Sequence, residues 1–260
     1  MSMRLESAEV RFGGLVAVRN MDLAIEPARI TAVIGPNAAG KSTVLRVLAG
    51  VQALHAGTVS IDGVDLGGMP GGLRARRIGL LPQRGGVSGP FLTREVVEFG
   101  TFARDRGALG FWSVDAAIAA VGLEGEADRP LNRLSVGQQQ RAGLARAMVQ
   151  VDPSDGGVLL LDEPFSAQDP REIERIAAIL REFRDAGGTV VAAMHEVGLA
   201  WSVADEAILL DRGELRRAGV VEEVLAPPAL EALFGTPFVR TPHGPVPDSR
   251  RRDASSVRDG

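Results

Sequence analysis

The sequence contains no cysteine and only three histidines, and none of its apolar runs is long. The absence of cysteine excludes disulfide bonds, thiolate metal sites and cysteine nucleophiles. No apolar run approaches the roughly 18–20 residues that a membrane-spanning helix requires. The first residues, MSMRLESAEVRF, lack the apolar segment of a secretion signal, so we expect a chain that is made and kept in the cytosol.

Positive charge is not in excess either, since the formal net charge is −4. A chain without a basic surplus lacks the composition typical of nucleic-acid-binding proteins, and we expect no nucleic-acid partner. The chain is otherwise ordinary for a globular protein, with 260 residues of which 45% are apolar and 24% are charged. This length predicts one large or two small domains with a sizeable buried core.

The pattern of apolar residues predicts an α/β fold with a mostly parallel sheet, flanking helices and an N-terminal antiparallel part. Strand-like and helical segments alternate in the two outer parts of the chain, which is typical of such a sheet. Beyond the strands expected within 3–34, strands are expected at 29–35, 57–66 (a hairpin), 77–83, 157–164, 189–195 and 206–213. Helices are expected at 41–50, 93–105, 113–123 and 169–188.

Between these outer parts the strand-like runs disappear, which predicts an inserted helical subdomain. The C-terminal tail is rich in proline, serine and charge, a composition that predicts disorder. The expected divisions are a first core segment (1–85), the helical subdomain (86–155), a second core segment (156–240) and the tail (241–260).

The stretch GPNAAGKST, residues 35–43, fits the pattern G-x-x-x-x-G-K-[ST] between an expected strand and an expected helix. Gly35 and Gly40 allow the backbone to wrap tightly, so that successive N–H groups point at phosphate oxygens. Lys41 is expected to reach the β- and γ-phosphates, and the Ser42 hydroxyl is expected to bind Mg²⁺. This stretch predicts a nucleoside-triphosphate site.

Two carboxylates follow the apolar run Val158–Leu161 directly. The C-terminal end of a buried strand is where α/β sheets place their ligands. Asp162 therefore suits the Mg²⁺ side of the site, and Glu163 is a candidate general base for the attacking water. His195 comes at the end of the next expected strand, as Asp162 and Glu163 do in theirs. A lone histidine is more often structural, but this position favours a role in the site.

The stretch LSVGQ, residues 134–138, predicts a second helix start, because Ser135 and Gln138 have the form of a capping box. Ser135 would begin a helix whose N–H groups form a second anion site. One nucleotide needs only one phosphate loop, so the second site would have to serve something else. Taken alone, these residues indicate an ordinary capped helix.

In their order along the chain, these motifs resemble those of the ATP-binding subunit of ATP-binding-cassette (ABC) transporters. The matches are GPNAAGKST to the Walker A loop, LLPQ to the Q-loop ending in Gln83, LSVGQ to the signature, VLLLDEP to Walker B, SAQD to the D-loop with Asp169, and His195 to the switch histidine. Phe12 matches the aromatic residue that stacks on adenine. The resemblance extends from residue 1 to about residue 240. It implies a P-loop NTPase core that hydrolyses ATP to ADP and phosphate with Mg²⁺.

The resemblance also implies a dimer, formed with a second copy or with another ABC subunit. The two subunits pair head to tail, and each signature covers the γ-phosphate held by the other subunit's Walker A loop. It implies catalytic roles for Glu163, His195 and Gln83, and Mg²⁺ ligation by Ser42, Gln83 and Asp162. It assigns nucleotide contacts to Phe12, Gly35, Pro36, Asn37, Ala38, Ala39, Gly40, Lys41, Ser42, Thr43, Ser135, Gly137, Gln138 and Asp169.

The chain departs from the family pattern at four positions. Val136 and Ala38 stand where the signature and the Walker A loop usually have glycine, and position 38 is variable in the family. Gln168 replaces the usual leucine of the D-loop, and Glu196 replaces a frequent aspartate. None of these changes removes a catalytic group, so we expect an active ATPase.

The stretches RARRIGLLPQ and TREVVEFG are similar to importer ATPases for iron–siderophore complexes, haem and vitamin B12. RFGGLVAV is similar to branched-chain amino-acid importers as well, so the transported substrate stays open. Either resemblance implies membrane permease subunits, a substrate-binding protein and a place on the cytoplasmic face of the cell membrane. An ABC ATPase of iron–sulfur cluster assembly is an alternative of another class. Paired-cassette translation or repair ATPases are disfavoured because this chain carries one cassette.

Overall fold

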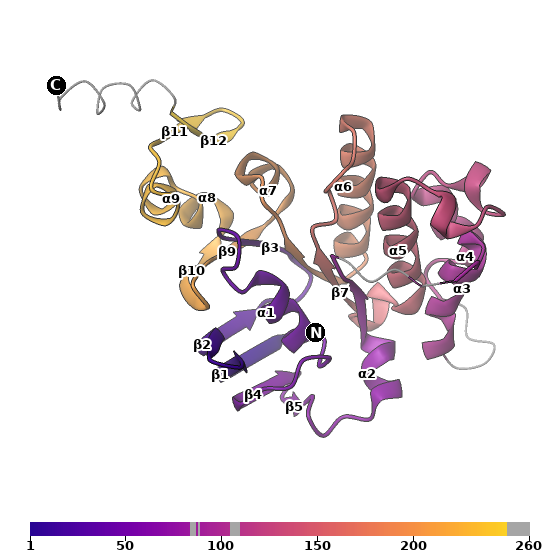
Figure 1. Cartoon of the computed structure of the whole chain (residues 1–260), viewed down its shortest axis with the longest axis horizontal. Coiled ribbons are helices and arrows are strands. Elements are labelled where there is room, and N and C mark those ends of the chain that lie inside the picture. The colour runs from indigo at the N-terminus through magenta and orange to yellow at the C-terminus, as the bar shows by residue number, and fades with distance from the viewer. Residues whose placement is uncertain (84–86, 88, 105–109, 249–260) are drawn as a thin grey trace.

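The computed structural model describes residues 1–83, 87, 89–104 and 110–248, which form two main sheets with helices around and between them (Figure 1). The strands are β1 (Met3–Phe12), β2 (Leu15–Ile25), β3 (Ile30–Ile34), β4 (Ala56–Ile61), β5 (Val64–Asp65), β6 (Ile78–Leu81), β7 (Val158–Asp162), β8 (Thr189–Ala193), β9 (Glu206–Asp211), β10 (Glu214–Val220), β11 (Phe238–Thr241) and β12 (Gly244–Pro247). The α-helices are α1 (Lys41–Leu48), α2 (Gly71–Arg77), α3 (Thr93–Glu98), α4 (Val114–Ala120), α5 (Val136–Gln150), α6 (Pro170–Asp185), α7 (Val197–Val203), α8 (Val221–Val224) and α9 (Pro227–Phe234). Short 3-10 helices are η1 (Phe99–Ala103), η2 (Glu124–Glu126), η3 (Leu131–Arg133) and η4 (Pro153–Asp155).

The central sheet has six strands in the order β10-β9-β3-β8-β7-β6. All of its neighbouring pairs are parallel except β9 and β10, which are antiparallel at one edge. Every residue of β3, β7 and β8 is buried, as expected for parallel strands that are covered on both faces. The predicted α/β fold with a mostly parallel sheet is therefore confirmed.

The second sheet is antiparallel, in the order β2-β1-β4-β5, and contains the expected N-terminal antiparallel part. The turn between β4 and β5 is made by Asp62 and Gly63, both with positive φ, as a tight hairpin turn requires. Helix α1 contacts strands of both sheets. Its buried Val44 and Leu48 share one apolar cluster with Leu5 of β1 and Leu160 of β7. This packing fixes the start of α1 at the end of β3, where the phosphate loop lies.

The helices α3, α4 and α5 lie together beside the central sheet, at the right of Figure 1. In the described residues between β6 and β7 there is no strand, as expected for a helical insertion. Helix α5 contacts α3, α4 and β6, so its packing links this helical part to the sheet. No helix in the described ranges combines the length and the apolar character that a bilayer span requires.

The prediction of a disordered tail from residue 241 is wrong for residues 241–248. Strands β11 and β12 form an antiparallel hairpin that packs on α7. A Cβ on Gly244 would lie 2.7 Å from the Trp201 side chain, and the Arg240 guanidinium lies 5.1 Å from the centre of the same ring. This long-range contact offsets the polar composition from which disorder was expected. The rest of the tail, residues 249–260, lies outside the described residues.

Candidate nucleotide site

The phosphate loop joins β3 to α1 and has room for glycine alone at its two ends. A Cβ on Gly35 would lie 2.3 Å from the backbone oxygen of Leu210, and a Cβ on Gly40 would lie 2.6 Å from that of Ala17. Gly40 also has φ +103°, in a region that other residues rarely adopt. Gly40 is the N-cap of α1 and supplies no side-chain cap to the helix. The loop therefore brings the start of α1 to the site with its N–H groups uncapped by a side chain.

The Lys41 side chain folds back over this loop. Its Nζ donates hydrogen bonds to the carbonyl oxygens of Gly35 at 2.7 Å and Pro36 at 3.0 Å. Lys41 is only 6% exposed, and burial lowers the pKa of its ammonium group while Glu163 and Asp162 raise it. An ammonium held on two carbonyl oxygens can transfer to phosphate oxygens, which are stronger acceptors because they carry charge.

The Asp162 carboxylate ends β7 and fits a divalent cation. Its side chain is buried, and its Oδ1 accepts no hydrogen bond in the structure. Burial raises the pKa of Asp162, and the nearby Ser42 hydroxyl lowers it. A buried carboxylate oxygen without a donor is costly unless a cation or donor satisfies it. A carboxylate beside a hydroxyl is a hard oxygen donor set of the kind that Mg²⁺ prefers.

The next residue, Glu163, has a left-handed backbone with φ +57°, which turns the chain sharply at the end of β7. One oxygen of its carboxylate, Oε1, contacts two other predicted catalytic side chains. Gln83 Nε2 donates to it at 2.7 Å, and His195 Nε2 lies 2.5 Å from it. Strands β6, β7 and β8 are neighbours in the sheet, so the three groups that follow them converge at its C-terminal edge.

These groups surround one cavity of about 670 Å³. The predicted site residues that line it are Phe12, Asn37, Ala38, Ala39, Gly40, Lys41, Ser42, Thr43, Gln83, Glu163 and His195. Gly35 and Pro36 lie next to it and bind Lys41 through their carbonyl oxygens. With the Asp162 carboxylate beside Ser42, the arrangement combines a phosphate loop, a carboxylate suited to a cation and a held glutamate, which are parts needed for phosphoanhydride hydrolysis.

Six further residues line this cavity that the sequence patterns did not indicate: Gly14, Leu15, Val16, Ala17, Arg19 and Arg212. Leu15 pairs with Phe12 across the Gly13–Gly14 turn, and both are exposed, at 67% and 47%. Two exposed apolar residues flanking a two-glycine turn are a sequence signal that could have shown Leu15. Arg212 comes from the distant β9–β10 turn, and no local pattern connects it to the phosphate loop.

The signature residues do not line this cavity. Ser135 is the N-cap of α5 and forms a complete capping box with Gln138, in which each side chain accepts a hydrogen bond from the other's backbone N–H. Asp169 caps α6 through its side chain alone, which accepts from Glu172 N at 3.0 Å. The structure therefore brings the phosphate loop, Glu163 and the switch histidine together, and Ser135, Gly137, Gln138 and Asp169 lie outside this cavity, with Gly137 buried.

Comparison with known proteins agrees with this geometry. The family model described as ABC transporter matches residues 18–166, which contain the phosphate loop, the signature and both Walker B carboxylates. The chain belongs to the ABC transporter family. As an ABC ATPase it is an ATP hydrolase, and the P-loop NTPase fold expected from its motifs is confirmed.

Among curated relatives of this ABC ATPase, the hemin import ATP-binding protein of Pseudomonas entomophila is 37% identical over 246 residues, covering 92% of this chain and 94% of the relative. The hemin import ATP-binding protein of Rhizobium meliloti is 36% identical over 238 residues, covering 90% and 91%.

Solved structures share the fold. A dimeric ATP-binding cassette in a post-hydrolysis state with ADP and phosphate is 27% identical, with a TM-score of 0.75 over 84% of this chain and 98% of that chain. A metal-chelate type ABC transporter in an inward-facing conformation, 21% identical, has a TM-score of 0.73 over 96% of this chain and 99% of that chain. The second shows the fold alone.

Proposed function

We propose that this ABC ATPase energises the import of hemin or a closely related metal chelate through membrane permease subunits. Its similarity to hemin import ATP-binding proteins along most of both chains supports this substrate class. In this proposal the chain works on the cytoplasmic face of the cell membrane, where ATP is available, and a substrate-binding protein delivers the cargo from the opposite side.

In the cavity, the loop from Gly35 to Thr43 would hold the ATP phosphates, and Phe12 would stack on the adenine. Mg²⁺ would be held by Ser42 and Asp162 with Gln83 beside them, and it would neutralise charge that develops on the phosphates. Lys41 would exchange its two carbonyl partners for phosphate oxygens. The buried Asp162 oxygen without a donor is the observation that supports a cation there.

Glu163 would act as the general base, accepting a proton from the water that attacks the γ-phosphorus. The P–O bond to the β-phosphate breaks, and ADP and inorganic phosphate leave. Before ATP enters, Gln83 and His195 hold the Glu163 carboxylate in place. Both are well placed to release Glu163 when they bind the γ-phosphate and its cation instead, so the base would become free only in the loaded site.

The observation that carries the proposal is the separation of the site into two halves within one chain. The cavity holds the phosphate loop and base, whereas the signature helix start lies on another surface with Val136 at 72% exposure. A second subunit related by two-fold symmetry would bring its signature to this cavity, and the signature of this chain would lie at the cavity of the second subunit. The dimeric form of a solved cassette of the same fold supports this pairing.

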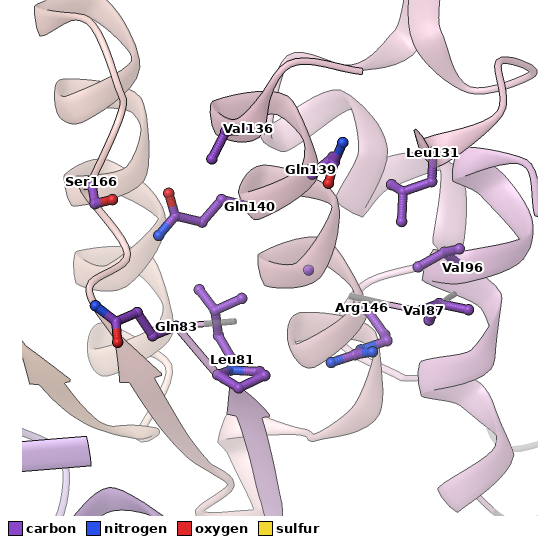
Figure 2. Close-up of a pocket in the computed structure, with 12 residues that line it drawn as sticks. Leu81, Gln83, Val87, Val96, Leu131, Val136, Gln139, Gln140, Arg146 and Ser166 are labelled. Carbon is purple, nitrogen blue, oxygen red and sulfur yellow. The ribbon is translucent and has the colours of Figure 1, made fainter. Parts of the chain in front are cut away.

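A second cavity, of about 280 Å³, suits the permease subunits (Figure 2). It lies between the end of β6 and the helical part, where Leu81 and Gln83 face Val96 and Leu131 across α5 (Figure 2). Arg146 reaches into it from α5; burial lowers the pKa of Arg146, and it has no acidic partner within the described ranges. We propose that a permease segment inserts here and supplies an acceptor for Arg146. Gln83, which lines both cavities, would then sense nucleotide and permease together.

The test is reconstitution of the chain with its cognate permease in proteoliposomes that contain ATP. Hemin-loaded binding protein should stimulate ATP hydrolysis and drive hemin uptake, whereas cobalamin, ferric siderophores and branched-chain amino acids should not. Gln83→Ala should keep basal hydrolysis measurable and abolish the stimulation. Stimulation by cobalamin or a ferric siderophore instead of hemin would move the proposal to another metal chelate, and stimulation by branched-chain amino acids would overturn the substrate class. Failure of the chain to co-purify with any permease would overturn the transport function.

A further inference from the structure

The side-chain amide of Gln168 connects the D-loop to the signature helix of the same chain. Its Nε2 donates to the carbonyl oxygen of Gly137 at 3.1 Å and lies 3.3 Å from Oε1 of Gln140. Its Oε1 accepts from Nη1 of Arg141 at 2.8 Å. Both ends of the amide are therefore engaged with the first two turns of α5. A leucine, which resembles Gln168 in size, could make none of these hydrogen bonds.

The backbone beside Gln168 is pressed against the signature glycine. A Cβ on Gly137 would lie 2.5 Å from the carbonyl oxygen of Ala167, and Ala167 itself has a left-handed backbone with φ +57°. The backbones of Gly137 and Ala167 thus leave no room for a side chain between them, and close packing of this kind transmits displacement. A movement of the signature start must therefore move the D-loop.

The connection continues from the D-loop to the catalytic end of β7. Gln140 Nε2 donates to the backbone oxygen of Glu163, so one glutamine side chain touches both Gln168 and the residue that carries the candidate base. Figure 2 shows Gln140 extending from α5 toward the segment that carries Ser166, three positions after Glu163. Gln140 and Gln168 together form a continuous polar bridge from Gly137 to Glu163, which we call the glutamine bridge.

We propose that the glutamine bridge couples the two ATP sites of the dimer, with Gln168 as its positioning residue. The proposal rests on the composite sites described above, in which the signature serves the partner's ATP and Glu163 serves the chain's own. Gly137 and Glu163 would then belong to different ATP sites although one chain carries both. Binding of a γ-phosphate at the signature would shift α5 and, through Gln168 and Gln140, adjust the backbone of Glu163 in the other site.

The test is the dependence of the hydrolysis rate on ATP concentration in the purified full-length chain. Two coupled sites give a Hill coefficient between one and two, and independent sites give one. Gln168→Leu should lower the Hill coefficient below the wild-type value and should change the maximal rate by less than about threefold, because no group that touches ATP is removed. Gln168→Glu should do the same, since it keeps the acceptor for Arg141 and loses the donor to Gly137 and Gln140.

Gln140→Leu cuts the same bridge at its other end, so the double variant with Gln168→Leu should lose no more cooperativity than either single variant. The control is Gln150→Leu at the far end of α5. Gln150 donates to the carbonyl oxygens of Ala75 and Ile78, both at 2.8 Å, and contacts neither half-site. Gln150→Leu should reduce thermal stability and leave the Hill coefficient at its wild-type value.

Measuring ATP-dependent dimer formation distinguishes failure of the glutamine bridge from failure of the composite ATP site. In the Glu163→Gln background, both the parent and its Gln168→Leu derivative should dimerise with ATP and Mg²⁺. A wild-type Hill coefficient of one, or an unchanged coefficient in Gln168→Leu with the dimer intact, would overturn the bridge alone. Absence of the dimer in the Glu163→Gln parent would overturn the composite site and the bridge together.

Discussion

Two helix starts in this chain are formed in opposite ways, those of α1 and α5. The start of α1 has a left-handed glycine, Gly40, as its N-cap, with no side-chain cap, and the following Lys41 is buried. The start of α5 has Ser135 as its N-cap in a complete capping box with Gln138, and the following Val136 is largely exposed. One start lies in a cavity without a cap, and the other is capped and faces outward.

This difference shows what each start can do without a partner. Helix starts attract anions because their N–H groups lack intrahelical acceptors. At α1 the same chain brings Gln83, Glu163 and His195 to the cavity in which those groups lie. At α5 the capping box already stabilises the helix in the free subunit. An anion can therefore bind there without having to stabilise the helix. A start of this second kind suits a contact between subunits.

The largest effect is expected when hydrolysis is stopped with both helix starts left intact. Glu163→Gln removes the proposed base and keeps one acceptor oxygen for Gln83 and His195, so the hydrolysis rate should fall by about 10²–10⁴-fold while ATP binding persists. Single-turnover hydrolysis and equilibrium binding of labelled ATP measure the two quantities. A turnover close to that of the wild type would refute the role of Glu163 as base.

The next effect breaks the start of α1. Gly40→Ala places a Cβ 2.6 Å from the carbonyl oxygen of Ala17 at a φ that alanine rarely adopts. The loop must shift, and loss of one or two charge-assisted contacts of about 1.5–3 kcal/mol should weaken ATP binding by at least about tenfold. Gly72→Ala in α2, where a Cβ meets nothing within 4 Å, is the control and should bind ATP normally. Equal affinities for the two variants would contradict this account of the loop.

These two helix starts also show what the sequence predicts and what it leaves out. The phosphate loop is local, because β3, the loop and α1 follow one another over residues 30–48, and spacing alone puts Lys41 and Ser42 at the start of α1, where the structure has them line the cavity. Their contacts with a nucleotide stay predictions. The capping box of Ser135 and Gln138 is equally local and was confirmed. The nucleotide contacts predicted for Ser135 and Gln138 depend on a second subunit, and they stay predictions.

Apart from Leu15, which lies beside Phe12 in the sequence, the features missed from the sequence depend on contacts between distant segments. Arg212 lines the nucleotide cavity from a turn that is remote in sequence from the phosphate loop. Gln168 was identified only as a departure from the family pattern, and its hydrogen bond to Gly137 spans 31 positions. The part of the hairpin from residue 241 onward was expected to be disordered because the tail is rich in proline, serine and charge, and composition does not reveal the ring of Trp201 against which it packs.

A smaller and more selective effect is expected at the start of α5. Ser135→Arg in the Glu163→Gln background fills the space proposed for the partner's phosphate and leaves the Walker A loop of the same chain untouched. The monomer should still bind ATP, though more weakly without the second half-site, and the ATP-dependent dimer should disappear. Sedimentation velocity with labelled ATP reports both. Dimer formation by the double variant would show that LSVGQ is only a helix cap.

The smallest effect separates capping from phosphate binding at that same serine. Ser113 caps α4 as Ser135 caps α5, its side chain accepting from Ala116 N at 3.1 Å, and nothing places Ser113 at a nucleotide site. Ser113→Ala and Ser135→Ala should therefore each lower the free energy of unfolding by about 0.5–2 kcal/mol. Only Ser135→Ala should also weaken the ATP-dependent dimer of Glu163→Gln, because it alone removes a hydroxyl aimed at a partner. Chemical denaturation measures the first effect and sedimentation the second. Equal dimer affinities in the two variants would mean that the Ser135 hydroxyl serves its own helix and nothing beyond it.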